Sequence, residues 1–284
     1  MRIAVASGKG GTGKTTVATN LAFVASQDGR SAAYLDCDVE EPNGAIFLKP
    51  QIQQGQPVGT PVPKVDLDKC TGCGKCGKIC QYSAILAMNK TVLTFPELCH
   101  GCGGCRLVCP AGAIAEDQHE IGRLQVGQAG SVQFVQGILN VGQARGSSLI
   151  RAVKLAAPQA DLLIVDCPPG TSCPVIEAVR SSDYVLLVTE PTPFGLNDLT
   201  LAVETVRALK IPFGVVINRA DVGDNQTKNY CRQQRIDVLA EIPDDRQVAE
   251  AYSRGEMICE VIPKYRDLYS DLLNQVKTRI ARVR

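Results

Sequence analysis

The sequence lacks features that would indicate a nucleic-acid partner or a membrane span. Its 30 basic and 29 acidic residues leave almost no net charge, so no overall electrostatic field attracts nucleic acid or anionic lipid. No apolar stretch approaches the ~20 residues that a membrane-spanning helix needs. The chain has only two histidines, His100 and His119, and neither lies in a pattern that indicates a role. We expect no nucleic-acid partner and no membrane association.

A secretory leader is not expected either. Met1 leads almost directly into the apolar run from Ile3 to Ala6, which lacks the charged and apolar regions of a signal peptide. The thirteen cysteines are therefore not expected to form the disulfide framework of a short secreted scaffold. We expect reduced thiols and a cytoplasmic protein.

Strands and helices alternate in the two outer parts of the chain. A strand at Arg2–Ala6, a glycine loop, a helix at Thr15–Ser26 and a strand at Ser31–Leu35 form a βαβ pattern. Further apolar strands are expected at Asp161–Asp166, Tyr184–Thr189 and Phe213–Asn218. This alternation predicts an α/β fold with a parallel sheet.

A cysteine-dense segment interrupts this pattern. The stretch Gln51–Pro63, rich in Gln, Gly and Pro, is predicted to be a linker. Two similar cysteine segments follow, with a period of 29 residues counted from Cys70 to Cys99. We predict a small α+β domain at residues 61–118, inserted into a larger α/β domain formed by residues 1–60 and 119–284. Residues 119–148, rich in Gly and Gln, match no clear pattern.

The glycine loop matches G-x-x-x-x-G-K-S/T, the phosphate loop of nucleotide hydrolases. In such loops the backbone N–H groups and the helix N-terminus face the phosphates. Lys14 would neutralise the β- and γ-phosphates, and the Thr15 hydroxyl would bind Mg²⁺. The predicted phosphate-binding residues are Gly8, Lys9, Gly10, Gly11, Thr12, Gly13, Lys14, Thr15 and Thr16.

Dinucleotide binding is the alternative for this loop. Gly8, Gly10 and Gly13 also satisfy G-x-G-x-x-G, and Asp36 ends the next strand, where a ribose-binding acid stands in dinucleotide-binding folds. The Lys14–Thr15 pair favours a triphosphate, because a pyrophosphate bridge offers neither a γ-phosphate nor Mg²⁺ to these two side chains.

Other strand ends complete the predicted site. Asp166 ends an apolar strand, as does the carboxylate that holds the Mg²⁺ water shell in phosphate-loop proteins. Gly170 follows in "CPPGTSC", where its N–H could sense a γ-phosphate. Asp36 and Asp38 stand at a neighbouring strand end, and either could orient water.

Lys9 beside the glycines, in K-G-G-T-G-K-T-T, resembles the deviant phosphate loop of the MinD, ParA, Mrp and nitrogenase-iron-protein superfamily. The resemblance implies ATP-dependent dimerisation, with a like chain or a related ATPase, in which Lys9 crosses the interface and hydrolysis resets the dimer. It also implies catalytic roles for Lys9, Lys14, Asp38 and Asp166, a switch role for Gly170, and adenine contacts by Asn218 and by the loop that contains Pro243.

Each cysteine segment has the spacing C-x₂-C-x₂-C-x₃-C. This is the bacterial two-cluster ferredoxin spacing, in which the fourth cysteine of each segment binds the other cluster. The predicted ligand sets are Cys70, Cys73, Cys76 and Cys109 for one [4Fe–4S] cluster, and Cys99, Cys102, Cys105 and Cys80 for the other. Cys₄ zinc sites are the alternative, but they seldom need the third closely spaced cysteine.

Two smaller expectations concern packing. The remaining cysteines are expected to be buried, because free cysteine behaves as a small hydrophobe; these are Cys37, Cys167, Cys173, Cys231 and Cys259. For Cys167 and Cys173 the alternative is a thiol site at an interface. The C-terminal segment places Leu268, Leu272, Val276 and Ile280 at helical intervals. We expect this helix to pack on the sheet rather than to anchor the chain to a membrane.

The whole chain resembles MinD-superfamily ATPases that contain an inserted ferredoxin domain. This resemblance implies an ATPase that binds ATP and Mg²⁺ and couples a dimer switch to electron transfer through two [4Fe–4S] clusters, with an unidentified redox partner protein. The alternatives are an iron–sulfur cluster carrier or scaffold and a positioning ATPase of the MinD or ParA type.

Overall fold

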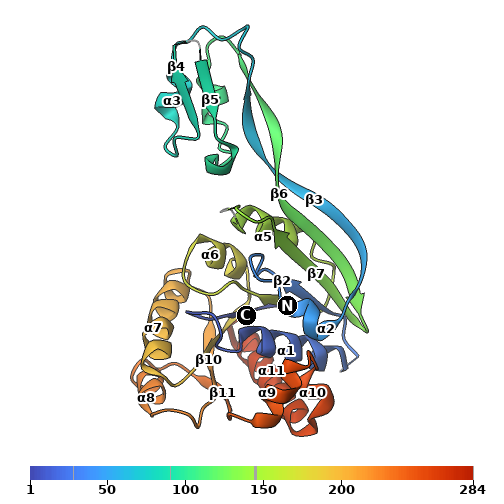
Figure 1. Cartoon of the computed structure of the whole chain (residues 1–284). Coiled ribbons are helices and arrows are strands. Elements are labelled where there is room, and N and C mark those ends of the chain that lie inside the picture. The colour runs from blue at the N-terminus through green and yellow to red at the C-terminus, as the bar shows by residue number, and fades with distance from the viewer. Residues whose placement is uncertain (28, 90, 144–145, 284) are drawn as a thin grey trace. The chain divides into compact units, whose positions relative to one another are not determined.

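The computed structural model describes residues 1–27, 29–89, 91–143 and 146–283 (Figure 1). The chain divides into two compact units. The first comprises Met1–Gly55, Leu124–Ile138 and Ile150–Arg284, and the second comprises Gln56–Arg123 and Leu139–Leu149. The second unit is therefore wider than the predicted insert at 61–118, and it contains a further short segment.

A sheet of nine strands has the order β11-β10-β9-β1-β8-β2-β7-β6-β3. The first strand lies at its centre, between β8 and β9, and runs parallel to both. The strands of the sheet are β1 (Arg2–Ala6), β2 (Ala32–Asp36), β3 (Gln51–Val65), β6 (Ile114–Ala129), β7 (Val132–Leu139), β8 (Leu162–Asp166), β9 (Tyr184–Thr189), β10 (Phe213–Asn218) and β11 (Val238–Ile242). The predicted α/β fold with a parallel sheet is confirmed.

Helices cover the central strands, whose residues are buried on both faces, as is usual for parallel sheets. α1 (Lys14–Gln27), α10 (Ile258–Val261) and α11 (Pro263–Val283) share one core with residues such as Ile3 and Tyr34. The other helices of the α/β part are α2 (Gly44–Leu48), α5 (Gly146–Leu155), α6 (Cys173–Val179), α7 (Pro193–Ala208), α8 (Gln226–Gln233) and α9 (Arg246–Ser253).

The C-terminal helix packs on the core, as expected. Leu272 and Val276 of α11 are fully buried, and Ile280 is nearly so. Within the residues described, no helix combines the length and the apolar character needed to cross a membrane.

The predicted linker at Gln51–Pro63 is wrong, because this stretch belongs to β3. It contains Pro57, Pro61 and Pro63, and proline cannot donate a hydrogen bond within a sheet. β3 is the last strand in the order of the sheet, and an edge strand is where proline is tolerated. Proline and glycine at an edge therefore produced the same composition as a linker. Residues 119–129 continue β6, and β7 follows after a short turn.

Short elements carry the cysteines of the second unit. α3 (Lys75–Ile79) and α4 (Gly104–Leu107) each lie within one cysteine segment. The antiparallel pair β4 (Ile85–Met88) and β5 (Thr91–Thr94), followed by the 3₁₀ turn η1 (Pro96–Leu98), lies between the segments. A small buried cluster contains Val62, Ala84 and Cys99. A core of this size stabilises a domain only weakly without additional ties.

Replacing Leu272 with alanine should lower the free energy of unfolding by about 2–5 kcal/mol, because it leaves a cavity in the core that α11 shares with α1. Leu201→Ala on α7 is a matched control, since Leu201 is also helical but 47% exposed, and its effect should stay within about 0.5 kcal/mol. Chemical denaturation measures both, and equal losses would contradict the packing of α11.

Candidate nucleotide and cysteine sites

The phosphate loop connects the central strand β1 to α1 at the carboxyl edge of the parallel strands, where ligands bind in open α/β sheets. The backbone of Gly13 has φ +89°, and an added Cβ would collide with the Asn218 amide. Glycine is therefore required there, both for its conformation and for the close approach of β10. The loop residues that line the adjoining cleft are Gly10, Gly11, Gly13, Lys14, Thr15 and Thr16.

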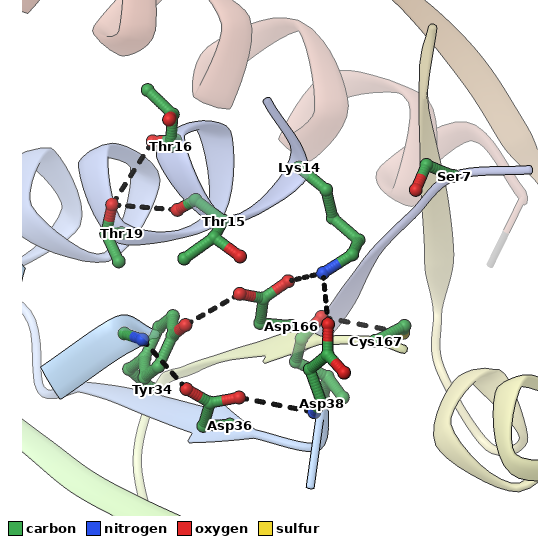
Figure 2. A network of polar contacts seen from close by, with 12 residues as sticks. Ser7, Lys14, Thr15, Thr16, Thr19, Tyr34, Asp36, Asp38, Asp166 and Cys167 are labelled. Atoms are coloured by element: carbon green, nitrogen blue, oxygen red, sulfur yellow. Dashed lines mark hydrogen bonds and ion pairs between the residues drawn. The ribbon is translucent and has the colours of Figure 1, made fainter. Parts of the chain in front are cut away.

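Lys14 meets two carboxylates at this edge (Figure 2). Its Nζ lies 2.9 Å from Asp166 Oδ1 and 3.3 Å from Asp38 Oδ2. Register explains the meeting, because β1 pairs directly with β8, which ends at Asp166. Burial alone lowers the pKa of Lys14, but Asp166 and Asp38 together outweigh burial and hold that pKa above its ordinary value. Lys14 is therefore a buried, permanently charged cation.

Asp36 and Asp38 have different surroundings, which the local pattern alone does not show. Asp36 is fully buried, and its carboxylate accepts hydrogen bonds from the backbone N–H groups of Gly44 (3.0 Å) and Asp38 (3.2 Å). Burial and the neighbouring Asp166 raise the pKa of Asp36. Asp38 lines the cleft. Asp36 thus binds backbone groups of the loop that carries Asp38, and of these two aspartates only Asp38 lines the cleft.

Lys9 lies outside the lining of the cleft and pairs with Glu190, at 3.9 Å between Nζ and Oε2. Glu190 follows β9 and also pairs with Arg219, at 3.5 Å. Gly8 packs against the backbone of Asp198 in α7 with no room for a side chain. The backbone N–H of Gly170 donates to the Ser7 carbonyl at 2.9 Å. The predicted switch glycine is therefore tied to the start of the phosphate loop.

The far end of the cleft is formed by residues that follow β10 and β11. Asn218 donates to the Thr12 carbonyl at 2.9 Å, so it ties the phosphate loop to this end. Asn218 and Pro243 both line the cleft. Three tyrosines that sequence patterns did not reveal also line it: Tyr252, Tyr265 and Tyr269. Their helices lie late in the chain, and no local motif marks them.

Tyr34 is the other residue that the sequence did not reveal. It lies inside β2, is fully buried, and donates its hydroxyl to Asp166 Oδ2 at 2.8 Å (Figure 2). A tyrosine in a buried strand is ordinarily a core residue, so its position in the sequence carries no signal of function. The hydroxyl and carboxylate of Thr15 and Asp166 are the hard oxygen donors that Mg²⁺ prefers, so these residues fit a magnesium ion.

The eight cysteines of the two segments line two separate cavities of the second unit. One cavity is lined by Cys70, Cys73, Cys76 and Cys109, and the other by Cys80, Cys99, Cys102 and Cys105. Each cavity therefore takes three cysteines from one segment and the fourth from the other. The cysteines that line each cavity are those of one interleaved set that the spacing predicts.

Backbone N–H groups point at several of these sulfurs. Ala84 donates to Cys80 Sγ and Ala113 to Cys109 Sγ, both at 3.3 Å. Gly101 donates to Cys99 Sγ at 3.4 Å. Such hydrogen bonds stabilise thiolates and tune iron–sulfur clusters. Among the described residues, no three His, Cys, Asp or Glu side chains are close enough to share a single metal ion.

None of the thirteen cysteines, all of which the structure describes, forms a disulfide. Of the five outside the two cavities, Cys37, Cys167, Cys231 and Cys259 are buried, which agrees with the packing expectation. Cys173, at the start of α6, is exposed, so the expectation is wrong for this residue. Cys173 begins α6 at the surface of the protein, whereas the other four cysteines lie in its interior.

The phosphate loop between a central parallel strand and its helix, with a lysine on strand-end carboxylates, defines a P-loop nucleotide-binding protein. The chain belongs to the CobQ/CobB/MinD/ParA nucleotide binding domain family, whose model matches residues 3–258. This family places it in the MinD/ParA superfamily of P-loop ATPases.

Relatives and solved structures extend the match over most of the chain. Protein MJ0578 of Methanocaldococcus jannaschii is 31% identical over 280 residues, covering 98% of this chain and 96% of that protein. An iron-sulfur cluster carrier protein of Pyrococcus furiosus is 25% identical and covers 89% of this chain and 77% of that protein. The cell division ATPase MinD of Pyrococcus furiosus shares the fold, with a TM-score of 0.60, 21% identity and 98% of both chains covered.

Replacing Lys14 with methionine should lower the free energy of unfolding by about 3 kcal/mol, because it leaves buried carboxylates without their cation. It should also abolish nucleotide binding. The control is Lys228→Met, which removes a cation at 2.7 Å from Glu241 on the surface and should cost less than about 1 kcal/mol. Denaturation and equilibrium nucleotide binding measure the two effects. Equal losses of stability in both variants would contradict the role of the buried pair.

Proposed function

We propose that this protein is an ATPase in which nucleotide-driven dimerisation controls electron transfer through two [4Fe–4S] clusters. The observation that carries the proposal is the pair of cysteine-lined cavities. Each holds one interleaved set of four cysteines, and four cysteine thiolates are the ligand set of a [4Fe–4S] cluster. When bound, such a cluster accepts and releases single electrons.

The cysteine pattern favours clusters over zinc. Each segment carries a third closely spaced cysteine, which Cys₄ zinc sites seldom need. Four cysteines, drawn from both segments, line each cavity. The N–H donors to Cys80, Cys99 and Cys109 also favour bound thiolates.

The nucleotide site supplies the switch. Lys14, Thr15 and Asp166 would hold Mg·ATP, with Asp38 placed to orient the attacking water. Lys9 is partly exposed and paired with Glu190 rather than turned into the cleft, so it is available to a second copy of the chain. Phe194 follows Glu190 closely in the sequence, lies in the first turn of α7 and is 79% exposed. This exposed ring and Lys9 suit a face that a second copy covers when ATP is bound.

The chain itself provides a route for coupling. The longer segment of the second unit, which carries the two cysteine segments, begins after Gly55, within β3, and ends at Arg123, within β6. β3 follows the segment that carries Asp36 and Asp38 after only a short helix. A change of the Asp38 loop on ATP binding therefore acts on the strand that leads into the cysteine unit. Hydrolysis would then time the delivery or acceptance of electrons.

Iron content tests the ligand sets. Anaerobically purified protein should hold about eight iron atoms per chain, four for each cluster. The double variant Cys70→Ser/Cys109→Ser should keep about four, because both cysteines line one cavity. Cys70→Ser/Cys80→Ser should lose nearly all, because these cysteines line different cavities. The control is Cys173→Ser, an exposed cysteine outside both cavities, which should keep about eight. Bound zinc, or equal iron in both double variants, would refute the assignment.

Coupling is tested by measuring the reduction potential of the clusters, by electron paramagnetic resonance, with and without a non-hydrolysable ATP analogue. The analogue should shift the potential and double the sedimenting mass in the wild-type protein. Lys9→Ala should lose both effects but still bind nucleotide, and Lys228→Ala, at a surface pair, should lose neither. An unchanged wild-type potential on nucleotide binding would refute electron transfer as the coupled function.

A second candidate is an iron–sulfur cluster carrier, which the similarity to the carrier proteins of Pyrococcus favours. A carrier binds its cluster labilely and passes it on, whereas an electron-transfer protein retains it. Incubation of the iron-loaded protein with an apo-ferredoxin separates the two. Transfer of iron and sulfide to the acceptor, stimulated by ATP, would favour the carrier, and retention of about eight irons would favour electron transfer.

A further inference from the structure

Tyr34 holds one oxygen of the carboxylate that the nucleotide site needs. Its hydroxyl donates to Asp166 Oδ2 at 2.8 Å, while Lys14 Nζ lies 2.9 Å from Oδ1 (Figure 2). The two oxygens of Asp166 therefore have different partners, one neutral and one charged. A phenol has a single proton to donate, so this bond fixes which oxygen faces away from Lys14.

The ring of Tyr34 is itself held in place. It stacks on Phe134 of β7, with ring centroids 5.7 Å apart and planes 14° apart. The Tyr34 oxygen lies 2.8 Å from Asp166 Oδ2, and a phenol hydroxyl carries the proton that a carboxylate accepts, so Tyr34 is the donor in this contact.

Tyr34 also contacts the segment that carries Asp38. A Cβ added at Gly44 would collide with the Tyr34 hydroxyl and ring, so the ring lies directly against the first residue of α2. The backbone N–H of Gly44 donates to Asp36 at 3.0 Å. The Tyr34 side chain thus contacts Asp166, at the end of β8, and also Gly44, where the loop that carries Asp38 leads into α2.

We propose that Tyr34 is a positioning residue, which keeps the Asp166 carboxylate in one orientation toward Mg·ATP and links that orientation to the Asp38 loop. This inference rests on the Mg·ATP binding proposed above. When Lys14 turns toward a phosphate, Asp166 loses its charged partner but keeps the hydrogen bond from Tyr34. The carboxylate then has no need to rotate, and Oδ1 stays free on the side of Lys14, which itself lines the cleft.

The test is Tyr34→Phe, which removes the hydroxyl and keeps the ring that stacks on Phe134. The dissociation constant of a non-hydrolysable ATP analogue is measured by calorimetry in Mg²⁺ and in EDTA. The gain in affinity that Mg²⁺ gives should fall by about 10- to 100-fold, the usual effect of losing a residue that orients a metal-binding side chain. Affinity in EDTA should stay within about twofold of the wild-type value.

Two further variants sharpen this test. Tyr184→Phe removes a hydroxyl from another buried strand tyrosine, outside the cleft, and should leave both affinities unchanged. Gly44→Ala displaces the Tyr34 hydroxyl without removing it, and should lower the Mg²⁺-dependent gain in the same way even if Tyr34→Phe did not fold.

Three results would separate the possible failures. An unchanged Mg²⁺-dependent gain in Tyr34→Phe and Gly44→Ala would overturn the proposed role. Equal loss of affinity in Mg²⁺ and in EDTA would also overturn it, because Tyr34 would then act only as part of the core. If the wild-type protein bound no analogue in either condition, the proposed nucleotide site itself would be wrong, and with it the role of Tyr34.

Discussion

The nucleotide site depends on one buried ion pair, Lys14 with Asp166. Lys14 comes from the first turn of α1 and Asp166 from the end of β8, 152 positions later. The pair forms because β1 and β8 are neighbours in the sheet. A buried cation is tolerated only beside its partners, so the pair ties the phosphate loop to the strand that must act with it. Asp38, Asp36 and Tyr34 are then arranged around this charge.

The same edge of the sheet brings the remaining site residues together. Parallel strands direct their carboxyl ends to one side, so Asp36, Asp166, Glu190 and Asn218, each at or just past a strand end, all lie there. Glu190 holds Lys9 and Arg219, and Asn218 holds the Thr12 carbonyl. In this structure the residues that would act on nucleotide are paired with one another. The proposed ATP binding would exchange these contacts for contacts with phosphate, which is how a ligand can drive a conformational switch.

The second unit, which carries the two cysteine segments, is stabilised in a different way from the α/β part. Its short helices and two-stranded sheet bury few apolar side chains, so it needs ties other than a hydrophobic core. The proposed clusters would supply such ties, because each cavity is lined by cysteines of both segments and a bound metal centre contributes to folding.

Local sequence determined the phosphate loop, the parallel α/β fold and the cysteine sets, because each depends on spacing within a few residues or on regular alternation. The tertiary structure decided those features that depend on which strands are neighbours in the sheet. It tied Asp36 to the backbone of Gly44, placed Tyr34 on Asp166, brought Tyr252, Tyr265 and Tyr269 to the cleft, and made Gln51–Val65 an edge strand rather than a linker. A buried tyrosine or an edge proline has the same local pattern whatever its neighbour, so only the order of the strands could assign these roles.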